Sequence, residues 1–216
     1  MIEGCIFDLD GVIVDTAHYH YLAWKRLANE LGYDLTEKEN EQLKGVSRMR
    51  SLEIILEQAG VSLNQEHKEM LAAKKNAWFN DYVQQMQPEE IFPGVRTLIR
   101  NMRGRGIKVG LASSSRNART VVRLLNIQSE FDAIVDGSMI TRTKPDPEIF
   151  LKTAKLMGIQ PADCVVVEDA EAGVQAALAA GMKCIGIGSS KILHRADRVF
   201  SKTSEVRLST LDEISH

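Results

Sequence analysis

The chain has 216 residues, of which 44% are hydrophobic and 26% charged, and 27 basic and 29 acidic side chains give a formal net charge of -2. This length suits one α/β domain, or a core domain with a smaller insertion. Because no long basic run is present, the sequence predicts neither a nucleic acid nor a membrane surface as a partner. Asp8 and Asp10 interrupt the apolar start that a signal peptide needs, and no stretch is long enough to span a bilayer.

The three cysteines, Cys5, Cys164 and Cys184, lie in or beside short apolar runs. Cysteines in such runs pack as small hydrophobic side chains, so we expect them to be buried and reduced. Because no paired Cys/His spacing is present, the cysteines predict neither a metal site nor a catalytic thiol. We therefore expect a cytoplasmic protein.

The first predicted strand is followed by a long helical segment. Gly4–Leu9 is a short apolar run, whereas residues 17–85 contain no convincing strand. Within that segment, apolar residues recur at helical spacing, as at Trp24, Leu27 and Leu31. The pattern predicts a helical cap domain over residues 17–85, inserted into a core domain made of residues 1–16 and 86–216.

From residue 86 onward, apolar runs alternate with amphipathic helices. The runs predict further strands at Ile107–Ser113, Ala133–Val135, Cys164–Glu168 and Lys183–Gly186, with a short edge strand at Arg198–Phe200. Strands separated by helices are typical of βαβ units. We therefore expect an α/β fold, a Rossmann-like parallel sheet covered by helices on both faces.

Carboxylates gather where two predicted strands end. Asp8 and Asp10 lie at the end of the first strand, and Glu168 and Asp169 at the end of a later one. The carboxyl ends of parallel strands meet at one sheet edge, where open α/β sheets bind ligands. Close carboxylates repel one another unless a cation lies between them, and oxygen ligands suit Mg²⁺. The sequence therefore predicts a Mg²⁺ site held by Asp8, Asp10, Glu168 and Asp169.

Hydroxyl groups and a lysine follow two other elements. The segment "LASSSRN" places Ser113, Ser114 and Ser115 where a strand becomes a helix, which favours an anion site. The segment "TKPDP" places Lys144 in a loop directly before a helix. Each motif alone also fits an ordinary turn, helix cap or helix start. Together with a Mg²⁺ site on one sheet edge, they are the recurring parts of phosphoryl transfer.

On these motifs the chain resembles, from end to end, the haloacid dehalogenase superfamily of Mg²⁺-dependent phosphotransferases. "DLDGVIVDT" at residues 8–16 is similar to the first motif of that superfamily. Ser113 resembles the second motif, Lys144 the third and Glu168-Asp169 the fourth. The helical insertion after the first motif resembles the first type of cap in that superfamily.

The resemblance implies a role for each core residue. Asp8 would be the nucleophile that forms an aspartyl-phosphate, and Asp10 the general acid and base. Ser113 and Lys144 would hold the transferring phosphoryl group, and Lys144 would also pair with Asp8. Mg²⁺ would be bound by the Asp8 side chain and the Asp10 backbone carbonyl, with help from the fourth motif.

The cap and the serine loop carry a narrower resemblance, to hexose-phosphate mutases of the same superfamily. The residues implied to bind substrate are Thr16, His20, Trp24, Lys44, Gly45, Val46, Ser47, Arg48, Ser51, Lys75, Asn76, Ser114, Ser115, Arg116 and Asn117. Arg48 would hold the phosphate that is not reacting, and His20 and Thr16 would couple cap movement to Asp10. The structural alternative is a packed histidine, a core tryptophan and solvated charges.

The reaction implied is the interconversion of β-D-glucose 1-phosphate and D-glucose 6-phosphate. It would run through the Asp8 aspartyl-phosphate and a glucose 1,6-bisphosphate that also serves as primer. The first alternative is a sugar-phosphate phosphatase of the same superfamily, in which water attacks the aspartyl-phosphate. The second is a non-catalytic sugar-phosphate binding protein, against which the intact motifs speak. Because a cap needs room to open, we expect a monomer.

Overall fold

The structure, a computed structural model, describes residues 1–43 and 47–215. The candidate residues Lys44, Gly45 and Val46 lie outside these ranges. The chain divides into two compact units, one made of residues 1–15 and 87–216 and one of residues 16–86.

The larger unit, which we call the core unit, contains a parallel sheet in the order β3-β2-β1-β4-β5-β6. The strands are β1 (Gly4–Phe7), β2 (Lys108–Ala112), β3 (Ala133–Val135), β4 (Cys164–Glu168), β5 (Lys183–Ile187) and β6 (Arg198–Phe200). The predicted α/β fold with a parallel sheet is therefore confirmed. β1 lies between β2 and β4, so the strand with the first acidic motif neighbours the strands that lead to Ser113 and Glu168.

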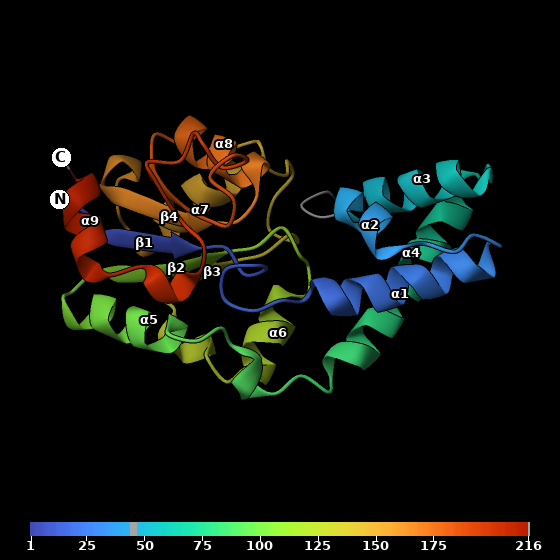
Figure 1. Cartoon of the computed structure of the whole chain (residues 1–216), viewed down its shortest axis with the longest axis horizontal. Helices are drawn as coiled ribbons and strands as arrows, with labels where there is room; N and C mark the ends of the chain where they lie inside the picture. The colour runs from blue at the N-terminus through green and yellow to red at the C-terminus, as the bar shows by residue number, and fades with distance from the viewer. Residues whose placement is uncertain (44–46, 216) are drawn as a thin grey trace. The chain divides into compact units, whose positions relative to one another are not determined.

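Helices cover the sheet from both sides. The core unit includes α5 (Val95–Gly104), α6 (Ala118–Leu124), α7 (Glu148–Met157), α8 (Glu171–Ala179) and α9 (Leu208–Ile214), with short 3₁₀ turns at Pro88–Glu90, Gln128–Glu130, Pro161–Asp163 and Thr203–Glu205. Figure 1 shows α7 and α8 above the sheet and α5 below it. Ile6 and Val166 of the sheet share one buried cluster with Phe150 of α7 and Ala177 of α8. Burial on both faces explains why the central strands are continuous apolar runs.

The smaller unit, which we call the helical unit, is built from α1 (Ala17–Glu30), α2 (Glu37–Asn40), α3 (Arg48–Ala59) and α4 (Gln65–Val83), with a 3₁₀ turn at Glu41–Leu43. Its core contains Trp24, Leu27, Leu52, Ile55 and Ala72 from three of these helices. α3 begins where the Ser47 side chain accepts a bond from the Arg50 N–H, and it ends at Gly60 with a φ of 67°. Among the helices that the described residues form, none has the length and apolar character needed to cross a bilayer.

Candidate active site

The strand order brings the predicted core residues to one sheet edge. Asp8 directly follows β1, and its N–H donates to the Val167 carbonyl of β4 at 2.9 Å, which continues the ladder. Glu168 is the last residue of β4, and Ser113 directly follows β2. All three are buried, with exposures of 7% for Asp8 and 1% for Glu168 and Ser113. Polar side chains buried this deeply need partners, and the site supplies them.

Lys144 joins the two acidic motifs. Its Nζ lies 2.5 Å from Asp8 Oδ1 and 2.5 Å from Glu168 Oε1. The other oxygen of Glu168 accepts the Ala170 N–H at 2.8 Å, so both oxygens of this carboxylate are engaged. Burial alone would lower the pKa of Lys144, but the Asp8 and Glu168 carboxylates outweigh it and raise that pKa above its usual value. Lys144 therefore stays charged and fixes the orientation of the Asp8 carboxylate.

The carboxylates still outnumber the cation. Burial raises the pKa of Asp8 well above its usual range, and the negative charges of Glu168, Asp10 and Asp169 add to this effect while Lys144 opposes it. Burial likewise raises the pKa of Asp169 to about 7, with Glu168 and Asp10 contributing. Asp10 and Asp169 thus add negative charge to the surroundings of the buried Asp8 carboxylate.

A hard divalent cation fits this donor set. The acidic groups of both motifs offer oxygen ligands, and their mutual repulsion shows that the cluster lacks positive charge. Over residues 1–43 and 47–215, no three His, Cys, Asp or Glu side chains already surround a common metal position. The fit therefore rests on the chemistry of the donors rather than on a preformed cage.

Two glycines let the acidic groups lie against the backbone. Gly11, with a φ of 73°, turns the chain after Asp10, and a side chain there would overlap the Asp169 carboxylate. A Cβ at Gly173 of α8 would overlap the Glu168 carboxylate. Sequence reasoning missed Gly173. Its position five residues after Glu168, in the first turn of a helix, was the available signal.

The serine loop is held by its own hydroxyl groups. Ser113 Oγ accepts the Ser115 N–H at 3.1 Å, and Ser115 Oγ accepts the Asn117 N–H at 3.2 Å. The Ser114 Oγ is buried without a hydrogen-bond partner among the described residues, whereas Arg116 is exposed. The loop thus combines a rigid backbone with hydroxyl and guanidinium groups that can bind an anion.

A second residue missed from the sequence, Glu148, shapes the loop that carries Lys144. The Glu148 carboxylate accepts the N–H groups of Thr141 at 3.0 Å and Arg142 at 2.8 Å, and the Thr141 hydroxyl at 2.9 Å. These backbone bonds lower the pKa of Glu148 to about 2. An acidic residue in the first turn of the helix after "TKPDP" was the sequence signal.

The helical unit contains its own buried cation. Lys75 of α4 is 2% exposed, and its Nζ lies 2.8 Å from His20 Nδ1 of α1 and 4.3 Å from the centroid of the Trp24 ring. His20 stacks on Phe79 with ring centroids 4.1 Å apart. Phe79, four residues after Lys75 on the same helix face, was not predicted from the sequence. Three of the predicted substrate-binding residues are thus brought together.

The surroundings of this cluster disfavour the charged forms of both ionisable groups. Burial lowers the pKa of Lys75 well below its usual value, and the positive charge of Arg48 adds to that effect. Burial also lowers the pKa of His20, with further lowering by Lys75 and Arg48. An anion placed near Lys75 and Arg48 would offset both shifts.

The remaining predicted residues of the helical unit lie on three helices. Ser47 caps α3, and Ser51 in the next turn is buried. Thr16 is buried at the start of α1, and Asn76 follows Lys75 in α4. Substrate binding by these residues stays a prediction.

Comparison with known proteins identifies the family. A protein-family model described as haloacid dehalogenase-like hydrolase matches residues 2–181. The chain is 42% identical to β-phosphoglucomutase of Bacillus subtilis (strain 168), over 98% of this chain and 95% of that protein. It is 31% identical to the phosphorylated carbohydrates phosphatase of Thermotoga maritima, over 99% of this chain and 100% of that protein. The crystal structure of β-phosphoglucomutase from Clostridium difficile superposes with a TM-score of 0.94 at 41% identity, covering 99% of this chain and 96% of that one.

Proposed function

The chain belongs to the haloacid dehalogenase-like hydrolase family, and within it we propose a Mg²⁺-dependent phosphomutase that interconverts β-D-glucose 1-phosphate and D-glucose 6-phosphate. The observation that carries the proposal is the buried Asp8 carboxylate, which Lys144 orients inside a cluster of acidic groups. Identity of 42% along almost the whole chain to a β-phosphoglucomutase supports mutase activity over the other activities of the family.

In this proposal Asp8 receives and returns the phosphoryl group. Phosphorylated Asp8 transfers its group to the C6 hydroxyl of β-glucose 1-phosphate, while the Asp10 carboxylate accepts the hydroxyl proton. The bisphosphate formed then reverses its orientation. An Asp8 oxygen attacks the C1 phosphorus, the bond from phosphorus to the C1 oxygen breaks, and Asp10 returns a proton to that oxygen. Glucose 6-phosphate leaves, and phosphorylated Asp8 is restored.

Other core residues hold the transferring group. Lys144 and Ser113 would bind its oxygens, since Lys144 Nζ bonds the Asp8 carboxylate and Ser113 directly follows β2, the strand that pairs with β1. Mg²⁺ would be held by the Asp8 carboxylate, the Asp10 carbonyl and the Glu168-Asp169 pair, and when bound it neutralises charge on the phosphoryl oxygens. The acidic cluster with raised pKa values supports this assignment.

We assign substrate binding to the helical unit and the serine loop. The proposed set is Thr16, His20, Trp24, Ser47, Arg48, Ser51, Lys75, Asn76, Ser114, Ser115, Arg116 and Asn117, with Lys44, Gly45 and Val46 from the segment outside the described residues. Residues 17–85 would act as a cap that excludes water while the aspartyl-phosphate exists. Lys75, buried beside an aromatic ring and an imidazole, supports an anion-binding role for this cap.

We further propose that the protein works as a monomer in the cytoplasm with glucose 1,6-bisphosphate as its primer. The three cysteines, which are free and buried, support a reducing compartment.

The second candidate function is a sugar-phosphate phosphatase, which the full-length similarity to the Thermotoga maritima phosphatase favours.

One assay separates the two functions. Purified protein is mixed with Mg²⁺, β-glucose 1-phosphate and a trace of glucose 1,6-bisphosphate, and glucose 6-phosphate and inorganic phosphate are measured in the same tube. The mutase forms glucose 6-phosphate with little free phosphate, and Asp8→Asn abolishes that activity. Release of phosphate without glucose 6-phosphate would establish the phosphatase instead.

A further inference from the structure

The turn after β3 holds the serine loop from one side. The Ser113 N–H donates to the Val135 carbonyl at 3.1 Å, which extends the pairing of β2 with β3. Two residues farther along each segment, the Gly137 N–H donates to the Ser115 carbonyl at 3.2 Å. The loop backbone is therefore fixed at two points by the end of the neighbouring strand.

Gly137 lies too close to the loop for any side chain. A Cβ built on it would overlap the Ser114 carbonyl oxygen and lie 2.9 Å from the Ser114 carbonyl carbon and 3.2 Å from the Arg116 nitrogen. These are backbone atoms, so they cannot rotate away as the end of a side chain can. The φ of Gly137 lies outside the left-handed region, so its own backbone would accept alanine. The obstacle to a side chain is the serine loop.

A buried carboxylate anchors the turn. Asp136 is 3% exposed, and its Oδ2 accepts the Arg119 Nε–H at 3.0 Å. Its Oδ1 accepts the Ser138 N–H at 2.8 Å and the Ser138 hydroxyl at 2.5 Å. The Arg119 Nη2 also donates to the Ile134 carbonyl at 2.8 Å.

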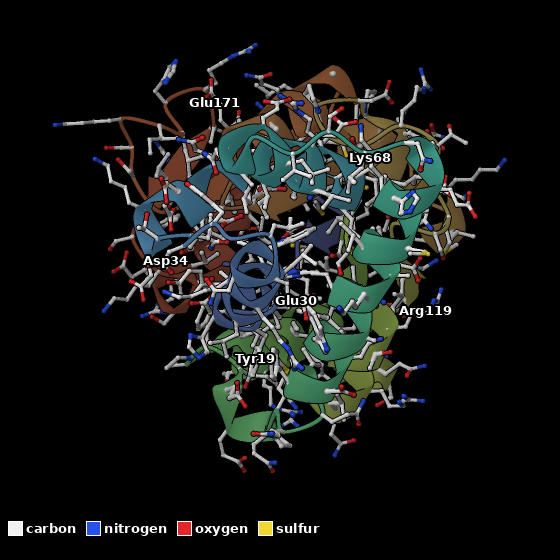
Figure 2. All side chains as sticks on the ribbon, turned by 90° about the vertical axis from the view of Figure 1, so that its right-hand side faces the viewer. Tyr19, Glu30, Asp34, Lys68, Arg119 and Glu171 are labelled. Carbon is white, nitrogen blue, oxygen red and sulfur yellow. The ribbon has the colours of Figure 1, made fainter. Side chains whose placement is uncertain are left out.

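Arg119 connects the turn to the far end of the loop. Arg119, which is labelled in Figure 2, lies in the first turn of α6, and this helix begins directly after the serine loop. Its bonds to Asp136 and to Ile134 therefore tie the first turn of α6 back to β3. The loop between β2 and α6 is held at its start, its middle and its end by one neighbouring segment.

We propose that Asp136, Gly137 and Arg119 are positioning residues for phosphoryl transfer. They keep the Ser113–Ser115 backbone and hydroxyl groups where the transferring group is met. The inference rests on the proposed function, in which Ser113 binds that group. Positioning of this kind acts on kcat. A mutation far from the reacting atoms that displaces a catalytic group by about 1 Å can lower the rate by about 10²-fold.

The decisive variant is Gly137→Ala, compared with Gly104→Ala. Gly104 is exposed at the end of α5, has an ordinary φ and has no atom within 4 Å of a built Cβ. We expect Gly137→Ala to lower kcat by about 10²-fold, with little change in KM for β-glucose 1-phosphate. Inhibition by aluminium tetrafluoride with Mg²⁺ and glucose 6-phosphate, which mimics the phosphoryl group during transfer, weakens by the same factor. Kinetics and inhibition equal to those of Gly104→Ala would overturn the proposal.

Two Arg119 variants test the proposal if Gly137→Ala does not fold. If near-UV circular dichroism shows that Gly137→Ala is not folded, Arg119→Met and Arg119→Lys decide. We expect Arg119→Met to lower kcat and weaken aluminium tetrafluoride inhibition, and Arg119→Lys to restore part of both, because lysine can still reach Asp136. Equal kcat in both variants and the parent would overturn the proposal.

Ser113→Ala separates this inference from the function on which it depends. Full mutase activity in Ser113→Ala would show that the serine loop does not bind the transferring group, and both proposals for the loop would fail. Loss of activity in Ser113→Ala together with parental kinetics in Gly137→Ala would overturn the positioning inference alone.

Discussion

Lys144 of the core unit and Lys75 of the helical unit are both almost fully buried, yet their surroundings are opposite. Lys144 lies 2.5 Å from each of two carboxylates, and their charges raise its pKa. Lys75 lies against an imidazole and an aromatic ring, and burial lowers its pKa. A buried lysine with counter-charges is a fixed structural cation, whereas a buried lysine without them can be stabilised in its charged form by a bound anion.

The largest effect should come from removing the lysine that has counter-charges. Lys144→Met leaves Asp8 and Glu168 buried without their cation, which should abolish turnover and reduce the free energy of unfolding by about 3–5 kcal/mol. Urea denaturation at pH 7 measures the loss, with Lys155→Met on the exposed face of α7 as the control. A Lys144→Met protein as stable as Lys155→Met would remove the basis for treating Lys144 as a fixed structural cation.

The raised pKa of Lys144 also fixes a direction in pH. Its folded pKa exceeds the unfolded value of about 10.4, so folding stability from this group is complete below that pH. This contribution is lost as the pH rises through the folded pKa. The difference in the free energy of unfolding between the parent and Lys144→Met should therefore have its full size at neutral pH and decrease only in strong alkali.

A cation should stabilise the region around Lys144 and leave the region around Lys75 unaffected. Mg²⁺ at 100 times its Kd should raise the free energy of unfolding by about 2.7 kcal/mol, because it binds the folded acidic cluster. EDTA should abolish turnover, and added Mg²⁺ should restore it. Thermal unfolding of the parent and Lys75→Met, each with EDTA or Mg²⁺, checks the effect, which should be equal in both proteins. Turnover that survives EDTA would contradict the proposed metal site.

Removing the other lysine should reduce activity without weakening the fold. Lys75→Met should lower kcat/KM by about 10- to 100-fold, the value of a hydrogen bond to a charged group. Its stability at pH 7 should equal or exceed that of the parent, because a lysine with a lowered folded pKa destabilises the fold below its unfolded pKa. That advantage should shrink as the pH rises toward 10.

Inorganic phosphate gives a second measurement on Lys75. It should raise the melting temperature of the parent more than that of Lys75→Met, since Lys75 would bind the anion. Lys74→Met is the matched control, because Lys74 precedes Lys75 on α4 and its half-exposed side chain bonds the Glu30 carboxylate at 2.6 Å. Glu30 is labelled in Figure 2. Loss of stability in Lys75→Met at pH 7 would show that Lys75 serves the fold.

The sequence predicted the strands better than their order in the sheet. Cys164–Glu168 was predicted from its run of buried apolar residues, and it forms β4 over the same residues. The first strand was predicted to reach Leu9 but ends at Phe7, where the chain begins to turn. Strand order was not predictable, because β1 pairs with strands about 100 and 160 residues away and local pattern is silent on such pairing.

Contacts across the fold were missed for the same reason. Gly137 is needed because the Ser114 backbone carbonyl, from the loop after another strand, approaches it, and no local pattern reveals that contact. The resemblance implies that Lys144 binds the phosphoryl group and pairs with Asp8, but its bond to Glu168 depends on how β4 lies beside β1. The motifs predict which groups react, whereas the order of the strands decides which carboxylates Lys144 contacts.

The smallest effect should come from changing Glu148, which lies four residues after Lys144. Its carboxylate accepts backbone N–H groups, whereas the Asp8 carboxylate is paired with a lysine. Glu148 accepts backbone N–H groups that lower its pKa to about 2. A lowered folded pKa adds stability above the unfolded value of about 4.3, and this is lost as the pH falls toward 2. Glu148→Gln should therefore be modestly less stable than the parent at pH 7, and the difference should narrow between about pH 5 and pH 3.

Urea midpoints at pH 7, 5, 4 and about 3 measure that difference, with Glu171→Gln in the first turn of α8 as the control for an acidic residue at a helix start. Because Glu148 fixes the loop that carries Lys144, Glu148→Gln should also lower kcat, though far less than Lys144→Met. A gap in stability that is constant from pH 7 to about pH 3 would show that the backbone bonds do not depend on the charge of Glu148. In that case the conformation of the loop would not require the charge of Glu148. Charge would then contribute to stability only through Lys144 and its two carboxylates.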